Sequence, residues 1–253
     1  KNYMIKRRTN VEIIALGFAL VILIGTCLLL MPWASEQTDF LDALFTATSA
    51  TCVTGLVVYD TATHWTLFGQ IVILILIQIG GLGFITIGVF LATYLKKKIS
   101  LRQRGLIEES VNSLKLSGGV KLVKHIIKGT FLFEGIGAII LSVVFSEKFG
   151  ISRGIYLGIF HAVSAFCNAG FDVLGTLEPY GSLVPYASNL IVNITIMVLI
   201  IIGGGILKVI YFLSNSIYSI FELDINFESM EFNIYLKSSK SSNVKILFFI
   251  DLL

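Results

Sequence analysis

Two short stretches of this sequence have the composition of a cation site built from backbone carbonyls rather than charged side chains. The first is LFTATSATCVTGLVV (residues 44–58), which has one glycine and no charged residue. The second, IFHAVSAFCNAGFDV (159–173), aligns with it without gaps at an offset of 115, with seven identities. Backbone carbonyls can replace the hydration shell of an alkali cation. The shared glycines, Gly55 and Gly170, can take the positive φ that turns successive carbonyls inward.

The residues predicted to form this site lie at and just before the two glycines. One glycine in such a loop is also explained as a packing or turn glycine, so the pore interpretation depends on its recurrence in both copies. The predicted filter segments are Cys52, Val53, Thr54 and Gly55, and Cys167, Asn168, Ala169 and Gly170. The carbonyls predicted to bind potassium are those of Val53, Thr54, Gly55, Asn168, Ala169 and Gly170.

A short helix over residues 40–51 is predicted to lead into the first segment. Asp39 and Asp42 stand at its start, where acidic side chains favour the positive helix end. At about 1.5 Å per residue it spans about 18 Å, only part of a bilayer core of about 30 Å. Irregular backbone at that depth must be buried by protein or line water. The stretch is therefore predicted to be a re-entrant pore loop.

The composition favours a membrane protein. The 253 residues are 55% hydrophobic and 14% charged, against about 25% charged in soluble domains. The net charge of +3 is too small to indicate nucleic acid as a partner, and no catalytic or metal-binding motif indicates an enzyme. Cys27, Cys52 and Cys167 lack CxxC spacing. Four segments are apolar enough to span a bilayer: 11–31, 67–95, 126–145 and 188–213.

The distribution of basic residues predicts the orientation in the membrane. Residues 96–128 contain nine lysines and arginines, whereas 32–66 contains none and has four acidic residues. Because cytoplasmic loops carry the excess of basic residues, the amino terminus and the 96–125 loop are predicted to be cytoplasmic. Residues 32–66 and 146–187 are predicted to face outward. The first apolar segment is too long for a cleaved signal peptide, which predicts an uncleaved anchor.

The repeat extends beyond the loops and gives a domain plan. IQIGG (77–81) matches IIIGG (200–204) at an offset of 123, so both copies read as span, half-buried stretch, span. The predicted parts are a first repeat over 1–95, a basic cytoplasmic loop over 96–125, a second repeat over 126–210 and a divergent tail over 211–253.

These motifs resemble the Trk/Ktr/HKT superfamily of potassium transporters, and most of all the bacterial Ktr membrane subunit. TSATCVTGL (48–56) and SAFCNAGFD (164–172) resemble that family's first two filter loops, and IQIGGLGFITIG (77–88) its first helix after a loop. The implied fold is all-α and polytopic, with membrane-loop-membrane (M1-P-M2) repeats of a pseudo-fourfold, potassium-channel-like pore. Gly55 and Gly170 match the first two of its four filter glycines.

The resemblance also implies a function and partners. Family members take up potassium across the plasma membrane, with sodium as a required or stimulating ion, as in a symporter. The implied partners are the lipid bilayer, a second copy in a homodimer, and a cytoplasmic nucleotide-binding regulatory ring. Potassium, with sodium as a second candidate, is expected as the transported ion, and no cofactor is expected on this chain.

The chain departs from the family pattern after Gly204. Only two repeats are present, and residues 206–253 contain no Gly, Ala, Pro, Thr or Arg. Two explanations stay open for the tail: an out-of-frame translation beginning near Gly205, or a divergent cytoplasmic segment. The chain is therefore predicted to be a truncated transporter. Two other functions stay open: a non-conducting fragment that associates with full-length subunits or the ring, and a carrier whose substrate site is the glycine-broken helix at 80–83.

Two polar residues in apolar segments have structural and functional interpretations. For Glu134, in the third segment, two interpretations stay open. It is either part of an ion or proton pathway, or a carboxylate that pairs with Lys128 or faces the helix bundle. Gln78, in the second segment, is predicted to make an interhelical hydrogen bond.

Overall fold

The computed structural model describes residues 10–83, 86–88, 119–206, 223–226, 231–235 and 245–248. The chain divides into two compact units, Lys1–Gly204 and Gly205–Leu253. Most of the predicted basic loop, residues 96–118, lies outside the described residues.

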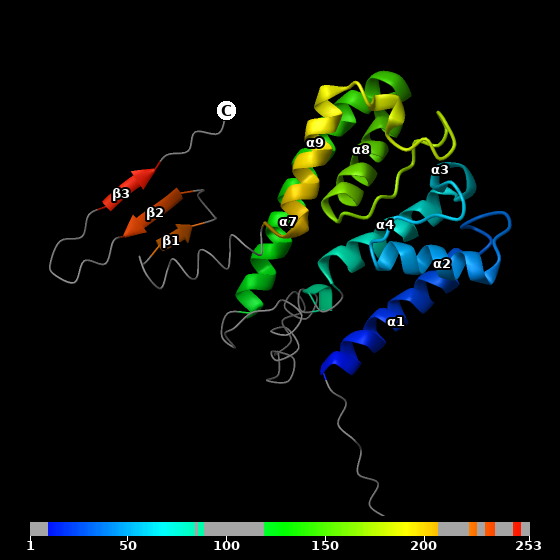
Figure 1. Cartoon of the computed structure of the whole chain (residues 1–253), viewed down its shortest axis with the longest axis horizontal. Helices are drawn as coiled ribbons and strands as arrows, with labels where there is room; N and C mark the ends of the chain where they lie inside the picture. Colours follow the sequence, from blue (N-terminus) through cyan, green and yellow to red (C-terminus); the bar gives the residue numbers. More distant parts are fainter. Residues whose placement is uncertain are drawn as a thin grey trace, which may run out of the picture. The chain divides into compact units, whose positions relative to one another are not determined.

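The first unit is helical throughout its described elements (Figure 1). In chain order these are α1 (Asn10–Leu29), α2 (Phe40–Thr51), α3 (Thr61–His64), α4 (Leu67–Leu82), α7 (Gly119–Phe149), α8 (Ile151–Phe166), a 3-10 turn (Val184–Tyr186) and α9 (Leu190–Ile201). A π-helical turn over Ile202–Ile206 follows α9.

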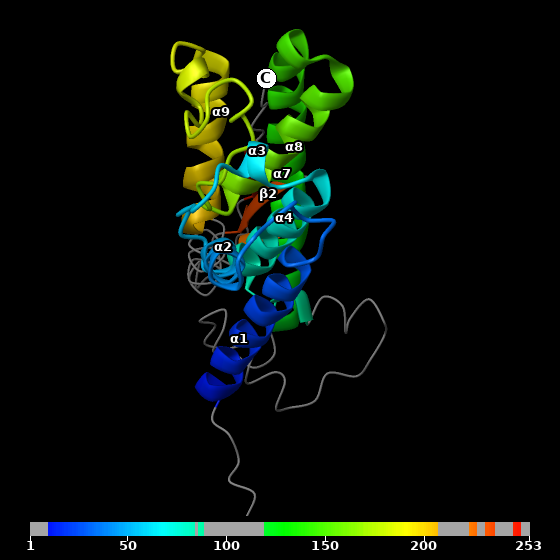
Figure 2. The same cartoon turned by 90° about the vertical axis from the view of Figure 1, so that its right-hand side faces the viewer.

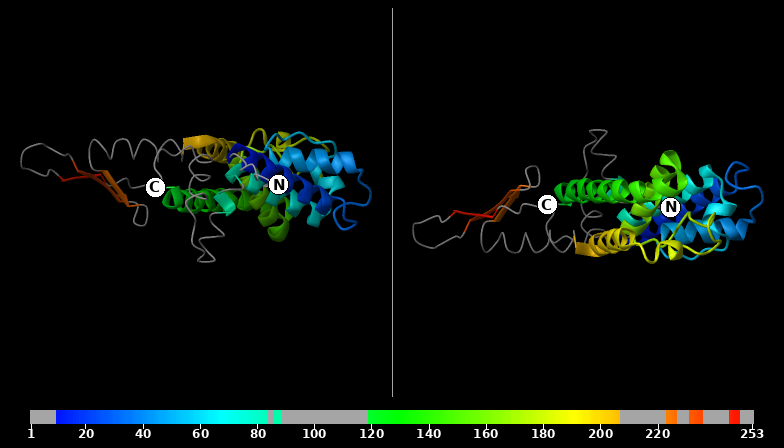
Figure 3. Two further views of the ribbon diagram at one scale, coloured as in Figure 1. Left: turned by 90° about the horizontal axis from the view of Figure 1, so that it is seen from below. Right: turned by 90° about the horizontal axis from the view of Figure 1, so that it is seen from above.

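The helices of this unit form two groups of three. α1, α2 and α4 contact one another, as do α7, α8 and α9, and α4 contacts α8 between the groups. Figure 1 shows the groups in blue to cyan and in green to yellow. Figure 2 shows α1 below α2 and α4, and Figure 3 shows the helices gathered side by side. Each group contains, in order, a long helix, a shorter helix that is followed by a cysteine, and an apolar helix.

The helix ends follow local signals in the sequence. The hydroxyl of Thr66 accepts a hydrogen bond from the Gly69 N–H and so caps the start of α4. The side chain of Asn189 caps α9 in the same way through the Val192 N–H. Gly83 ends α4 because it takes a φ of 79°, which a residue with a Cβ rarely adopts.

The helices found at the four predicted membrane spans differ in length. Val11–Leu29 and Ile126–Phe149 are long and apolar enough to cross a membrane, whereas α4, α8 and α9 are shorter apolar helices. The predicted span over 67–95 is interrupted at Gly83, and its residues 89–95 lie outside the described part of the chain, as do residues 207–213 of the last one. The predicted short helix over 40–51 is confirmed, because α2 has the same bounds.

The second unit contains an antiparallel three-stranded sheet in the order β1-β2-β3, formed by Leu223–Asn226, Glu231–Tyr235 and Lys245–Phe248. The all-α prediction is therefore wrong for the tail, although it holds for the described helices of the first unit. The strands pair Phe232 with Phe248 and Ile234 with Ile246. Aromatic and β-branched residues at opposed positions favour strands, which explains the difference.

Candidate functional site

The two predicted filter segments follow the carboxyl ends of α2 and α8 and have the same backbone conformation. Val53 and Asn168, which are equivalent in the repeat, have φ values of 54° and 59°. Gly55 and Gly170 have φ values of 76° and 72°. Positive φ is rare outside glycine and unfavourable for a β-branched residue, and such outliers tend to occur where function requires the conformation. The same unusual backbone is therefore built twice.

The backbone N–H groups of both segments donate back into the preceding helix in the same pattern. Cys52, Val53 and Thr54 donate to the carbonyls of Thr48, Ala50 and Ser49 at 2.8, 3.3 and 2.9 Å. In the second copy, Cys167, Asn168 and Ala169 donate to the carbonyls of Val163, Ala165 and Ser164 at 2.9, 3.0 and 2.8 Å.

The carbonyls of these segments are left free by this arrangement. Within the described residues, no hydrogen bond ends on the carbonyl oxygens of Val53, Thr54, Gly55, Asn168, Ala169 or Gly170. A free backbone carbonyl inside a protein requires water, a cation or another donor as its partner. The described residues contain no cluster of three or more His, Cys, Asp or Glu side chains.

The structure brings the two segments into contact at their glycines. A Cβ placed on Gly55 would lie 2.7 Å from the Ala169 carbonyl oxygen and 3.2 Å from the Gly170 Cα. A Cβ on Gly170 would lie 3.4 Å from the Gly55 Cα. Glycine at position 55 is therefore required by its neighbour as well as by its own φ.

Glycines of α4 and of the segment after α9 hold the carboxyl ends of α2 and α8. A Cβ on Gly80 would collide with the backbone carbonyl of Thr51, the last residue of α2. A Cβ on Gly203 would collide with the carbonyl of Phe166, the last residue of α8. Small residues permit this close approach between apolar helices. A Cβ on Gly81 would lie 2.5 Å from the Sγ of Cys167, whereas a Cβ on Gly83 would meet only the Thr86 hydroxyl at 4.0 Å.

Side chains behind the two segments differ in detail. The Thr54 hydroxyl donates to Ser49 Oγ at 2.9 Å, whereas in the second copy Ser164 Oγ donates to the Phe171 carbonyl at 2.6 Å. Cys52 is exposed and its equivalent Cys167 is buried. The first segment thus has an uncovered side in the described part of the chain.

Comparisons with known proteins identify the family of this chain. The profile of the TrkH family, described as a cation transport protein, matches residues 1–232. The chain belongs to the TrkH family. This family is one of membrane transport proteins and not of enzymes. The match extends past Gly205, where the composition of the tail changes.

Individual relatives of this TrkH-family chain cover most of it. It is 48% identical over 202 residues to the potassium/sodium uptake protein NtpJ of Enterococcus hirae, covering 79% of this chain and 44% of that protein. It is 45% identical over 199 residues to the Ktr system potassium uptake protein B of Bacillus subtilis, covering 78% and 44%. For the protein of the same name from Vibrio alginolyticus the identity is 37% over 194 residues, covering 76% and 42%. The chain thus spans less than half the length of these relatives.

A buried carboxylate lies beside the second segment of this TrkH-family chain. Glu134 of α7 is 5% exposed and accepts a hydrogen bond of 3.0 Å from Gln78 Nε2 of α4. The predicted interhelical hydrogen bond of Gln78 is thereby confirmed. The thiol of Cys167 lies 4.0 Å from the same Glu134 oxygen, so this carboxylate connects both helix groups to the second filter segment.

A second link joins the loops that follow the two predicted filter segments, and the sequence did not reveal it. The Asp60 carboxylate is 5% exposed and accepts hydrogen bonds from the N–H groups of Ala62 and Thr63. Its other oxygen accepts from the Tyr180 N–H at 2.9 Å. The Tyr180 hydroxyl in turn donates to the Val58 carbonyl at 3.3 Å. The signal that was available was the N-cap position of Asp60, which predicts the local bonds but not the distant one.

An aromatic and polar cluster surrounds His64 at the end of α3. Its Nε2 lies 2.8 Å from the Thr38 hydroxyl, and its ring stacks on Tyr59 at 3.9 Å. The Tyr59 hydroxyl donates to Asp42 at 2.8 Å, and this bond is the first cause of a raised Tyr59 pKa. Burial lowers the pKa of His64 from its ordinary value, against the opposing charge of Asp42.

Proposed function

We propose that this chain supplies two of the segments that form a potassium-selective filter, and that it takes part in potassium uptake across the plasma membrane. The observation that carries the proposal is the pair of loops after α2 and α8. Their N–H groups donate to the preceding helices, and no donor among the described residues bonds the carbonyls of residues 53–55 and 168–170. A dehydrated potassium ion needs such oxygens, and the negative ends of α2 and α8 favour a cation at the same place.

The proposed membrane arrangement has α1, α2 and α4 as the first M1-P-M2 repeat and α7, α8 and α9 as the second. The amino terminus and residues 96–125 are on the cytoplasmic side, and both filter loops open outward. Support comes from the equal order of helices in the two groups and from the equivalent contacts of Gly80 and Gly203. In a pseudo-fourfold pore, two further filter segments complete the ring. In the proposed arrangement they correspond to the part of the relatives' sequences that this chain does not match.

Potassium is the proposed cargo and sodium the second candidate. The Enterococcus hirae relative is named for potassium and sodium, and the Ktr proteins for potassium. We propose no cofactor for this chain. The proposed partners are a second membrane subunit in a homodimer and a nucleotide-binding ring on the cytoplasmic side, the face that carries the basic loop.

Growth of a potassium-uptake-deficient bacterium tests the proposal. The informative protein joins residues 1–204 to the part of the Enterococcus hirae relative beyond the matched region, so that four repeats are present. We expect this fusion to restore growth at low potassium and Gly55→Ala to abolish the rescue. The matched control is Gly135→Ala, because a Cβ there meets nothing within 4 Å. If the fusion is produced in the membrane but gives no rescue, the proposed filter role is wrong.

The alternative function is a non-conducting membrane protein that associates with full-length subunits or with the ring. It is favoured by the exposure of Cys52, which leaves one side of the first filter segment uncovered among the described residues. The same growth assay separates the two. Rescue by the 253-residue chain alone supports conduction without further repeats, whereas rescue by the fusion alone supports the alternative for the chain as it stands.

A further inference from the structure

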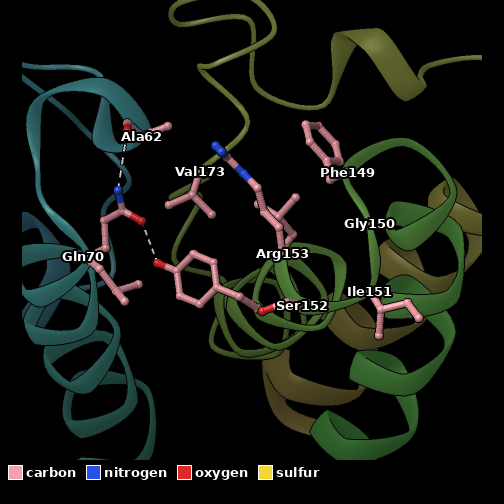
Figure 4. Close-up of a pocket in the computed structure, with 11 residues that line it drawn as sticks. Ala62, Gln70, Phe149, Gly150, Ile151, Ser152, Arg153 and Val173 are labelled. Atoms are coloured by element: carbon pink, nitrogen blue, oxygen red, sulfur yellow. Dashed lines mark hydrogen bonds between the residues drawn. The ribbon is translucent and has the colours of Figure 1, made fainter.

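An open cavity of about 570 Å³ lies between the start of α4 and the turn that joins α7 to α8 (Figure 4). It is lined from one side by Ala62, Leu67 and Gln70, and from the other by residues 149–153 of the turn and the start of α8. It lies away from the filter segments, none of which lines it. The cavity is therefore a separate feature that bridges the two groups of helices.

One wall of this cavity is cationic. Of the 11 lining residues only Arg153 is charged, so no carboxylate lines the cavity to neutralise it. The Arg153 guanidinium donates to the Thr176 hydroxyl at 3.2 Å and lies 5.7 Å from the centre of the Phe149 ring. These contacts use only part of its five-donor fork, which fits the oxygens of a phosphate.

The opposite part of the cavity holds neutral polar groups. The Tyr156 hydroxyl donates to Gln70 Oε1 at 2.6 Å, and Gln70 Nε2 donates to the carbonyls of Trp65 and Ala62. Figure 4 shows the bonds of Gln70 to the Tyr156 hydroxyl and to the Ala62 carbonyl. The amino end of α8 also opens on the cavity. Its N-cap, Gly150, has no side chain to cap the first N–H groups, which adds positive potential on the same side as Arg153.

Two rows of exposed apolar side chains run from the cavity along the flanking helices. Both α4 and α8 begin at the cavity, and each presents apolar residues at intervals of four, which places them on one face. All six are between 42% and 75% exposed: Leu67, Ile71 and Ile75 on α4, and Ile151, Ile155 and Ile159 on α8. A polar, cationic pocket at the head of apolar rows is suited to an amphiphile rather than to a free polar solute.

We propose that this cavity binds an anionic phospholipid of the outer leaflet, with its phosphate on the Arg153 guanidinium and its acyl chains along the apolar rows of α4 and α8. The proposal rests on the outward orientation given above for residues 146–187. Because α4 and α8 belong to different groups of helices, the bound lipid stabilises the contact between the two repeats behind their filter segments.

Native mass spectrometry of the purified, delipidated 253-residue chain tests this site directly. Phosphatidylglycerol is titrated as the probe, with phosphatidylcholine and inorganic phosphate as comparison ligands. We expect Arg153→Gln to weaken phosphatidylglycerol binding by about tenfold, the effect of losing one charge-assisted hydrogen bond. Lys148→Gln is the matched control, since Lys148 is a cation near the same end of α7 that does not line the cavity, and we expect it to leave the affinity unchanged.

A second variant addresses the shape of the cavity without removing the charge. Ser152→Trp fills part of it and is expected to lower the affinity for phosphatidylglycerol while Arg153 stays in place. Equal affinity of wild type and Arg153→Gln would overturn the proposal. Full displacement of the lipid by millimolar inorganic phosphate would overturn it in favour of a free-anion site. Equal binding of phosphatidylcholine, which has the same phosphodiester but no net charge, would overturn the assignment to an anionic phospholipid. Because the readout is binding, its failure is distinguishable from a failure of ion uptake.

Discussion

The carboxylate of Asp60 accepts a hydrogen bond of 2.9 Å from the backbone N–H of Tyr180, 120 residues further along the chain. The same side chain caps α3 through the N–H groups of Ala62 and Thr63. One buried carboxylate therefore orders the loop after the first filter segment and fixes it to the loop after the second.

Asp60→Ala is expected to destabilise the folded protein by about 1–3 kcal/mol, because it removes three backbone hydrogen bonds to one charged, buried carboxylate. Denaturant or thermal unfolding of the purified chain in detergent measures the change. Asp39→Ala is the control: Asp39 is at the N-cap of α2, is exposed and makes no side-chain cap bond. Its loss is expected to cost about 0.5 kcal/mol or less. Equal losses for the two variants would show that the link to Tyr180 contributes nothing.

Alanine at the two filter glycines is expected to have unequal effects. Both positions have a φ above 70°, so each Cβ adds about 1–2 kcal/mol of backbone strain. At Gly55 the Cβ also lies 2.7 Å from the Ala169 carbonyl oxygen, whereas at Gly170 its nearest atom is at an ordinary 3.4 Å. Gly55→Ala is therefore expected to reduce selectivity for potassium over sodium more than Gly170→Ala does.

The measurement for the glycine pair is cation-dependent uptake by the four-repeat fusion carrying each variant. Gly135→Ala gives the baseline for a glycine with open space around it. A larger effect at Gly170 than at Gly55 would contradict the steric ranking. No effect at either position would contradict the filter assignment.

Gly80→Ala and Gly203→Ala are expected to cause similar losses of folded protein. A Cβ on Gly80 would collide with the carbonyl of Thr51 at the end of α2. A Cβ on Gly203 would collide with the carbonyl of Phe166 at the end of α8. Overpacking of this kind costs about 1–3 kcal/mol when the backbone shifts to relieve it. The yield of monodisperse protein and the midpoint of thermal unfolding measure both variants against Gly135→Ala. Tolerance of one and failure of the other would show that the two repeats are not equivalent at this contact.

The sequence predicted the parts of the site that depend on the repeat. The 115-residue offset identified Gly55 and Gly170, and the acidic residues and length of the apolar stretch placed the helix at 40–51, the bounds that α2 has. Pattern reasoning succeeded there because a helix that leads into a loop is a local feature. The membrane arrangement and the ion ligands stay predictions.

The features that the sequence did not reveal depend on residues far apart or on unusual side chains. Val53 and Asn168 have positive φ although valine is among the residues least suited to it. The bond from Tyr180 to Asp60 joins loops with no shared motif. In the tail, the short apolar runs have no periodicity that predicts strands. The pairing of residue 232 with residue 248 joins positions that are distant in the sequence.

Stability of the cluster around His64 is expected to fall as the pH drops through the range in which histidine titrates. Burial lowers the pKa of His64 below its ordinary value of about 6.5, so between these two pKa values the unfolded chain binds more protons than the folded one. Stability therefore decreases as the pH falls below about 6.5 and is fully present above it.

His64→Phe keeps a ring to stack on Tyr59 but has no group to titrate, so the pH dependence of stability should be smaller. Unfolding midpoints of both proteins between about pH 8 and pH 5 measure the difference, in which the contributions of His125 and His161 cancel. Parallel curves would mean that His64 does not titrate differently in the folded and unfolded states.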